Sequence, residues 1–293
     1  MADYKSAYFY LALTILLWSA TPAVAKLGLE EINNIQLLFY CNVVGIISLS
    51  IAVLALGKAR FLSQYKISDY ARMFGMGFLG LYLYYIFLYG GFALAPAGQA
   101  NMINYLWPLF VVIFSILILK EKFTWKTLLA IAMGFAGALI VFSHGDFSSF
   151  QNEYTPGYLL AFAGAMCYGL FSVLGKKLRY EAFTSMLVFY LASLLLVTPT
   201  MLLLYGFVFP HSLTTWLAIF FLGGLSNSIG FVFWFKALEK GKTASLANLI
   251  YINPFLSLVY VFFLNGESIP AISILGLALI VGGALVQLKS AEK

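Results

Sequence analysis

Residues 101–119 read NMINYLWPLFVVIFSILIL, and residues 247–264 read ANLIYINPFLSLVYVFFL. In each stretch a Tyr-x-x-Pro motif opens a long apolar run, and the same landmarks follow in the same order. The landmarks, each repeated after 146 residues, are the motif at 105–108 and 251–254, a glutamate at Glu121 and Glu267, and Gly-Ala-Leu at 137–139 and 283–285. The constant offset of these landmarks indicates an internal duplication. We therefore predict two halves, residues 1–147 and 148–293.

The composition places the chain in a membrane. Of its 293 residues 62% are hydrophobic and only 10% are charged, with a mean hydropathy of +0.94. A soluble domain carries about 25% charged residues, so nucleic-acid-binding proteins, secreted disulfide scaffolds and cytosolic enzymes are excluded. Cys41 and Cys167 both fall in apolar runs, where a free thiol acts as a small hydrophobe.

Polar residues divide the sequence into ten apolar runs, and a membrane-spanning helix needs about 20 apolar residues. The predicted fold is therefore an all-α membrane protein with ten transmembrane helices. Their expected ranges are 8–27, 37–56, 71–93, 98–119, 128–142, 157–174, 185–207, 213–235, 244–264 and 271–288.

The distribution of positive charge predicts the orientation. If the N-terminus is cytoplasmic, all of the 17 Lys and Arg residues except Lys26 fall on the cytoplasmic side, as the positive-inside rule requires. An N-in/C-in chain with five helices per half places the two halves upside down relative to each other, the usual construction of secondary transporters. Lys26 either snorkels from the end of the first helix or gates the outer mouth.

The proline in the first quoted stretch predicts a helix break. Pro108 removes a backbone donor and frees a carbonyl one turn earlier, near Asn104. Asn101, Asn104 and Pro108 lie at i, i+3 and i+7, near one face of a helix. Within the hydrocarbon region such a break is tolerated only where it is buried in protein or lines a cavity.

The second quoted stretch repeats this arrangement, with Asn248 and Tyr251 ahead of Pro254. Pro22 is expected to kink the first helix in the same way. Paired breaks favour a binding pocket between the halves, and we expect gating movements at the three prolines. The alternative is that the asparagines only bond neighbouring helices.

The predicted membrane core carries no Asp or Glu in the middle of any span, and both histidines fall in outer loops. These absences disfavour proton-coupled export of cationic drugs. No catalytic residue, metal site or cofactor is predicted either. Gly241-Lys-Thr243 resembles the end of a phosphate-binding loop, but Lys236 stands where that motif needs a glycine.

Aromatic side chains flank the polar or broken segments. Tyr and Trp offer a flat apolar face with one hydrogen-bond donor, which suits aromatic or amphipathic ligands of low net charge. With the asparagines above, the candidate substrate-binding residues are Trp18, Tyr82, Asn101, Asn104, Trp107, Tyr168, Trp234, Asn248 and Tyr251.

Three stretches carry a resemblance to a known family: MINYLWP at 102–108, LAFAGA at 160–165, and the segment from 234 to 241. With the Leu-Trp-Ser at 17–19, they resemble the EamA-type transporters of the drug/metabolite transporter superfamily, and most closely its aromatic amino acid exporter branch. The resemblance covers the whole chain and matches residues Trp18, Tyr82, Asn104, Tyr105, Trp107, Pro108, Trp234 and Tyr251.

This resemblance implies a cavity lined by helices 1, 3, 4, 6, 8 and 9, which opens alternately to each side. Lys26 stands where that branch has an arginine. Leu83 and the apolar Ala-Pro-Ala at 95–97 replace an acid and histidines of the branch.

We therefore expect a multi-pass inner-membrane exporter of amino acids, with aromatic or other bulky neutral ones as the favoured substrates. Facilitated diffusion and coupling through a loop acid both remain open. The expected partners are the lipid bilayer and a small-molecule substrate, with no nucleic acid, for a monomer or homodimer. The alternatives are an exporter or exchanger of another metabolite or drug, and a non-transporting membrane scaffold.

Overall fold

The computed structural model describes residues 4–95, 100, 103–122, 124–143, 152–265 and 271–291. Within these residues the ordered structure is helical, and no β-strand occurs. The all-α part of the predicted fold class is thereby confirmed. The expected boundary between the halves, at residues 147 and 148, lies outside the described residues.

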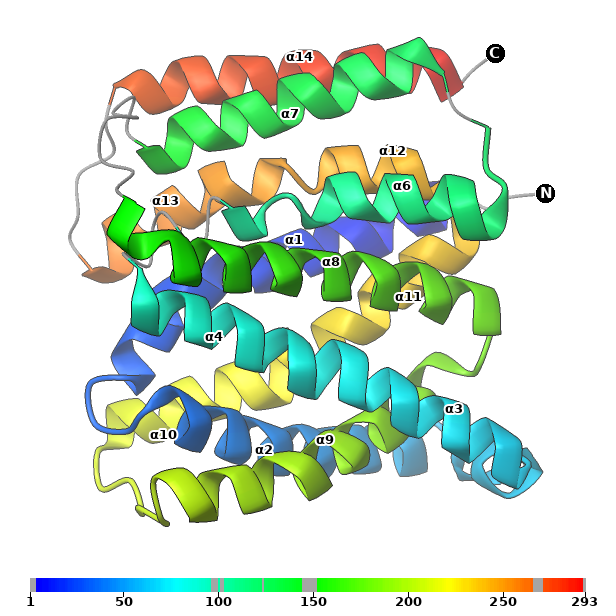
Figure 1. The fold of residues 1–293 in the computed structure, drawn as a ribbon. Coiled ribbons are helices and arrows are strands. Elements are labelled where there is room, and N and C mark those ends of the chain that lie inside the picture. The colour runs from blue at the N-terminus through cyan, green and yellow to red at the C-terminus, as the bar shows by residue number, and fades with distance from the viewer. Residues whose placement is uncertain are drawn as a thin grey trace.

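The helices run alongside one another in a bundle with short connections (Figure 1). The first half of the chain contains α1 (Tyr4–Gly28), α2 (Asn34–Ala55), η1 (Ala59–Gln64), α3 (Ile67–Gly77), η2 (Phe78–Leu83), α4 (Tyr84–Leu94), α6 (Trp107–Leu119) and α7 (Trp125–Ser143). The second half contains η3 (Asn152–Tyr154), α8 (Thr155–Leu178), α9 (Ala182–Leu204), α10 (Leu213–Ile219), η4 (Phe220–Ile229), α11 (Gly230–Lys240), α12 (Thr243–Leu249), α13 (Ile252–Asn265) and α14 (Ile272–Ala291).

Six helical segments are long and apolar enough to cross a membrane: Tyr4–Ala25, Asn34–Ala55, Ile67–Leu88, Thr155–Leu178, Ala182–Leu204 and Leu213–Lys240. Shorter apolar helices cover Trp107–Leu119, Trp125–Gly137 and Ile274–Gly283. Large apolar side chains on the outside of these helices, such as Leu54 and Leu203, are exposed as lipid-facing residues would be.

Local sequence explains where several helices begin and end. Asn33 caps α2 by accepting hydrogen bonds from the backbone N–H groups of Ile35 and Gln36, and the Gln36 side chain bonds back to Asn33. This reciprocal arrangement is a capping box. Gly57, with φ of 62°, turns the chain after α2, a conformation that glycine adopts without steric cost.

Two long helices each contain a wide π-helical segment. Helix α3 runs through η2 into α4, and α10 runs through η4 into α11. A π segment redirects backbone carbonyls and is frequent at functional sites. Both segments lie at the middle of their helices, and in η4 the carbonyls of Gly224 and Ser226 accept hydrogen bonds from Ser48 of α2 and Trp18 of α1, respectively.

The two helix boundaries at the Tyr-x-x-Pro motifs are also at mid-bundle. Helix α6 begins at Trp107 with Pro108 in its first turn, and α13 begins at Ile252 with Pro254 in its first turn. Proline is favoured there because its missing N–H would be unpaired anyway. Turn residues, including Tyr105 and Tyr251, separate these helices from the preceding segments.

Pro22 does not interrupt its helix, and a kink at this residue stays a prediction. Helix α1 continues through Pro22 to Gly28. One proline removes a single backbone hydrogen bond, and α1 is held on both sides by packing against α11 and α13. The side chains of Pro22 and Lys26 lie outside the described residues.

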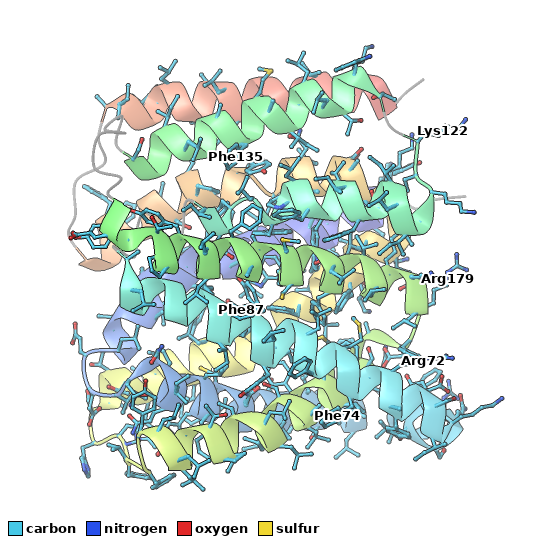
Figure 2. The ribbon with its side chains drawn as sticks, viewed as in Figure 1. Arg72, Phe74, Phe87, Lys122, Phe135 and Arg179 are labelled. Carbon is cyan, nitrogen blue, oxygen red and sulfur yellow. The ribbon has the colours of Figure 1, made fainter. Side chains whose placement is uncertain are left out.

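Helix packing divides the bundle into two peripheral helix pairs and a core between them. Helices α7 and α14 pack along each other at one edge, while α2 packs with α9 at the other (Figure 1). Between them, α1 contacts α11 and α13, and α8 contacts α4 and α6. Figure 2 shows Arg72, Lys122 and Arg179 at the end of the bundle near the N-terminus, so cationic side chains gather at one end.

Candidate functional site

Five aromatic side chains meet at the middle of the bundle, and we call them the aromatic cluster. They are Trp18 of α1, Trp107 of α6, Tyr168 of α8, and Phe231 and Trp234 of α11. Trp18 lies in the centre, with its ring centroid 5.2–6.2 Å from those of the other four. Trp107 is 4.8 Å from Tyr168 and 5.6 Å from Trp234. Edge-to-face packing at these distances is favourable, so four helices converge on one aromatic centre.

Two indole N–H groups fix the orientation of the cluster. Trp18 donates from Nε1 to the carbonyl of Ser226 at 3.1 Å, inside the π segment η4. Trp234 donates from Nε1 to Oγ of Ser172 at 3.1 Å. Both rings therefore present apolar faces to the interior while their polar edges are satisfied.

A polar network lies beside the cluster at the two helix boundaries. Ser19 hydrogen-bonds Oδ1 of Asn253, and Asn253 donates from Nδ2 to the Tyr105 hydroxyl at 3.1 Å. The Tyr251 hydroxyl donates to the Tyr105 carbonyl at 3.3 Å. The network therefore joins α1, the helix that carries Trp18, to both Tyr-x-x-Pro segments.

Asn104 has an unpaired oxygen at the edge of the cluster. The residue is buried, its Oδ1 has no hydrogen-bond partner among the described residues, and its Nδ2 makes only a long 3.5 Å bond to the Tyr84 hydroxyl. Tyr84 in turn contacts Tyr168, with ring centroids 4.9 Å apart. An unpaired buried acceptor costs about 1–3 kcal/mol. Such a group next to an aromatic surface is typical of a ligand-binding site.

Asn248 is also unpaired, but in another place. Neither amide atom has a partner among the described residues, and the side chain lies beside Gly134 of α7, where an added Cβ would approach Asn248 Oδ1 to 3.2 Å. Tyr82 lies away from the cluster too, with its hydroxyl bonded to Thr200 at 2.9 Å. Asn101 lies outside the described residues.

The structure thus brings Trp18, Trp107, Tyr168 and Trp234 together and places Asn104 at their edge. Sequence reasoning missed Phe231 and Tyr84. Phe231 lies three residues before Trp234, on the same face of α11, and this spacing could have identified it. No sequence signal distinguishes Tyr84 from its neighbour Tyr85. In the described part of the chain, no three His, Cys, Asp or Glu side chains gather to hold a metal.

A second polar network joins three segments at the end of the bundle near the N-terminus. Lys176 contacts Glu121 Oε1 at 3.0 Å, Thr243 Oγ1 at 2.8 Å and the carbonyl of Gly241 at 2.9 Å. Thr243 also donates to the Glu121 carboxylate at 2.6 Å. Lys176 therefore fastens the end of α8 to the segments that follow α6 and α11.

Replacing Lys176 with methionine is expected to destabilise the protein. The substitution keeps the apolar stem and removes a cation with three acceptors, and charge-assisted hydrogen bonds contribute about 1–2 kcal/mol after discounting for partial exposure. Thermal unfolding of purified protein measures the loss. Lys177→Met is the matched control, because Lys177 is the next residue in the chain and its side chain is exposed. An equal fall in the unfolding temperature of both variants would contradict a role for the network.

Comparisons with known proteins agree with these features. The model of the EamA-like transporter family matches residues 5–143 and again 155–288. The aromatic amino acid exporter YddG of Ancylobacter novellus is 31% identical over 72% of this chain and 73% of its own. A probable terminal-alkyne amino-acid exporter of Streptantibioticus cattleyicolor is 27% identical over 96% and 93%. A crystal structure covering 98% of this chain and 99% of its own superposes with a TM-score of 0.85 at 27% identity.

Proposed function

The chain belongs to the EamA-like transporter family, and from this premise we propose that it exports amino acids with aromatic or bulky neutral side chains. It is a multi-pass protein of the inner membrane, and its relatives transport small molecules. We propose no catalysed reaction and no cofactor. The bilayer and the transported solute are its proposed partners, for a monomer or a homodimer.

The aromatic cluster with the unpaired Asn104 oxygen is the observation that carries this proposal. The five aromatic rings pack against one another in this conformation, and movement of the halves would offer their flat apolar faces to an aromatic side chain, which gains favourable edge-to-face contacts beyond its burial. Asn104 Oδ1 is an acceptor in need of a donor, which a substrate ammonium or amide group supplies. The aromatic cluster would therefore select aromatic solutes, and Asn104 would bind their polar head group.

We further propose ten spans in two inverted halves, 1–147 and 148–293, with both termini in the cytoplasm. Two family matches, at 5–143 and 155–288, support the duplication. Helix packing supports the inversion: α8 contacts α4 and α6 in the same way that α1 contacts α11 and α13. The π segments and the two Tyr-x-x-Pro boundaries fall at corresponding places in the halves.

Alternating access follows from this construction. Rocking of the halves around the boundaries at Pro108 and Pro254 would expose the aromatic cluster to each side in turn. Because the residues of the cluster and of its polar network are neutral, the simplest energetics are facilitated diffusion down an outward gradient. Coupling through an acid outside the membrane core is the competing case.

Transport of another metabolite is the second candidate, since a relative from Rickettsia prowazekii, 22% identical over 69% of this chain, is an S-adenosylmethionine uptake transporter. A membrane scaffold is less well supported. It would have Asn104 and Asn248 bonded to each other or to backbone, and both instead retain unpaired atoms.

Flux from proteoliposomes tests the proposal. Vesicles that contain the purified protein are loaded with a mixture of amino acids, and release is measured with and without a pH gradient. The expected result is selective release of Phe, Tyr or Trp that ignores the gradient. Trp107→Ala should abolish it, while Trp125→Ala, an exposed tryptophan at the start of α7, should not. Release of no amino acid would overturn the proposal.

A further inference from the structure

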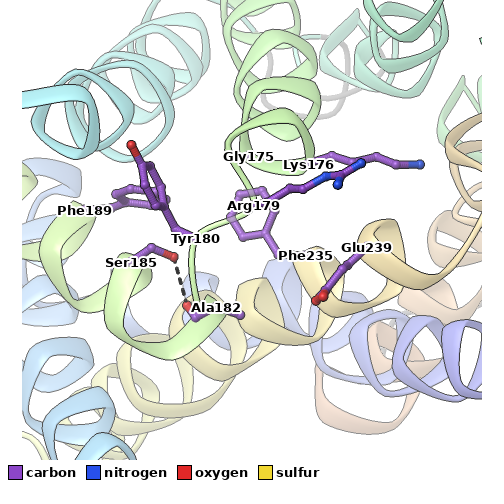
Figure 3. A pocket seen from close by; sticks show the side chains of 9 residues that line it. All are labelled: Gly175, Lys176, Arg179, Tyr180, Ala182, Ser185, Phe189, Phe235 and Glu239. Carbon is purple, nitrogen blue, oxygen red and sulfur yellow. Dashed lines mark hydrogen bonds between the residues drawn. The ribbon is translucent and has the colours of Figure 1, made fainter. Parts of the chain in front are cut away.

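A cavity opens at the end of the bundle that carries the N-terminus and the cationic side chains. It has a volume of about 430 Å³ and lies among Lys58, Tyr65, Arg179, Tyr180, Lys236 and Glu239. A smaller adjoining pocket shares Arg179, Tyr180 and Glu239 and reaches inward to Phe189 and Phe235. Figure 3 shows Arg179, Phe235 and Glu239 on one side of this pocket and Tyr180 and Phe189 on the other. We call the two together the vestibule.

Two lysines that line the vestibule are already paired, Lys176 with Glu121 and Lys58 with Glu181. Lys58 forms an ion pair with Glu181, which also caps α9 by accepting from the N–H of Thr184. Burial raises the pKa of Glu181, but its hydrogen bonds with Lys58 and Thr184 outweigh burial and lower the pKa overall. The carboxylate therefore stays charged and neutralises Lys58, so this pair forms a wall with no net charge.

Three other charges face the cavity without such pairing. Within the described parts of the chain, Arg179, Lys236 and Glu239 form no ion pair. Lys236 Nζ lies 5.1 Å from the ring centroid of Tyr10 and 5.2 Å from that of Phe183. The vestibule thus offers two cations and one carboxylate, the complement of a solute that carries one negative and one positive group.

Aromatic rings lead from the vestibule to the aromatic cluster. Tyr65 and Tyr180 pack edge to face at its outer wall, with centroids 5.6 Å apart. At its inner end, Phe235 lies 5.2 Å from Phe171, and Phe171 lies 6.0 Å from Tyr168 of the cluster. Tyr180 and Phe235 line the same small pocket, so aromatic side chains lie between the vestibule and the aromatic cluster.

We propose that the vestibule is a loading site for zwitterionic α-amino acids on the cytoplasmic side. Arg179 and Lys236 bind the carboxylate, Glu239 binds the ammonium group, and Tyr65 and Tyr180 contact an aromatic side chain. The inference rests on the proposed export of amino acids. It adds that discrimination between amino acids and their singly charged analogues begins at this site, before the solute reaches the neutral aromatic cluster.

Transport kinetics measured from the cytoplasmic side test the loading site. Arg179→Gln, Lys236→Gln and Glu239→Gln should each raise KM for phenylalanine by about threefold to tenfold and leave kcat within about twofold, since these contacts are exposed and modest in strength. The increase should shrink at high salt, because ions screen exposed charges. Lys177→Gln, which removes an exposed cation from the same helix end outside the vestibule, should change neither constant.

Analogue competition separates the two charges. Phenethylamine lacks the carboxylate, and 3-phenylpropionate lacks the ammonium group. Arg179→Gln should reduce the preference for phenylalanine over phenethylamine, and Glu239→Gln should reduce the preference over 3-phenylpropionate. Unchanged KM and preferences in a protein that transports phenylalanine would overturn the loading site alone, as would equal effects of Lys177→Gln. Absence of all amino-acid flux in the unmodified protein would overturn the proposed function and this inference with it.

Discussion

Asn104→Leu is expected to stabilise the protein and abolish transport at the same time. The Asn104 oxygen is buried without a partner, and its amide nitrogen makes only one long hydrogen bond. Replacing an unsatisfied polar group with an apolar one of similar shape removes a desolvation cost, so a gain of about 1 kcal/mol is expected. For a chain of this size, that gain raises the unfolding temperature by about 2–4 °C.

Loss of transport in the same variant follows from the proposed role of the amide. Leucine cannot accept a hydrogen bond from the polar head of a substrate, so flux should fall to the level of protein-free liposomes. Thermal unfolding and liposome flux, measured on the same preparation, check both parts. Asn104→Ala should abolish flux as well, although its smaller side chain offsets the gain in stability with a cavity.

Asn42→Leu is the matched control for this experiment. Asn42 is equally buried, but it donates from Nδ2 to Ser193 Oγ at 3.2 Å between α2 and α9. Removing this paired amide should lower the unfolding temperature. A destabilised Asn104→Leu protein would show that the amide is paired in the native state, and full flux would remove Asn104 from the substrate pathway.

Gly80→Ala is expected to cause a large loss of stability close to the aromatic cluster. Gly80 lies in η2, and a Cβ there would come within 2.2 Å of the Phe171 ring. That ring is fully buried, with Phe189 and Phe235 packed against it at 5.8 and 5.2 Å. Overpacking of such a site costs about 1–3 kcal/mol, which corresponds to a fall of about 2–12 °C in the unfolding temperature.

A second substitution should reveal the cause. Phe171→Leu in the Gly80→Ala background removes the clashing ring, so the two changes together should cost less than their sum by about 1 kcal/mol or more. Gly75→Ala, on the exposed face of α3 with no atom within 4 Å of the added methyl, should be neutral or slightly stabilising. Strict additivity of the first pair would rule out the steric explanation.

The sequence predicts the helical architecture and the residues of the aromatic cluster better than it predicts their neighbours. Prolines and polar turns act locally, so the boundaries near Pro108 and Pro254 can be read from a short stretch of chain. Tyr82 and Tyr84 illustrate the limit. They are two residues apart and point in different directions, and only the contact of α4 with α8 brings Tyr84 and not Tyr82 to the cluster.

Long-range contacts explain the other differences between the predicted and the observed positions of residues. Asn248 fits the predicted pattern of a pocket residue, yet the packing of α12 against α7 turns it toward Gly134. Lys176 looks like a membrane-surface anchor in sequence. Its partners Glu121 and Thr243 lie 55 and 67 residues away, and no local pattern indicates that they meet. The π segments are equally hidden, because one extra residue per turn leaves no compositional mark.

The aromatic cluster also makes the unlabelled protein its own optical reporter. Three of the five tryptophans in the chain, Trp18, Trp107 and Trp234, lie with ring centroids within 6.2 Å of one another. At that separation their electronic transitions couple, and the near-ultraviolet circular dichroism depends on the angles between the rings. Replacing Trp125 and Trp216 with phenylalanine would leave tryptophan bands that arise only from the cluster. Each change in its geometry would then be recorded by light absorption alone, without a dye or an attached probe.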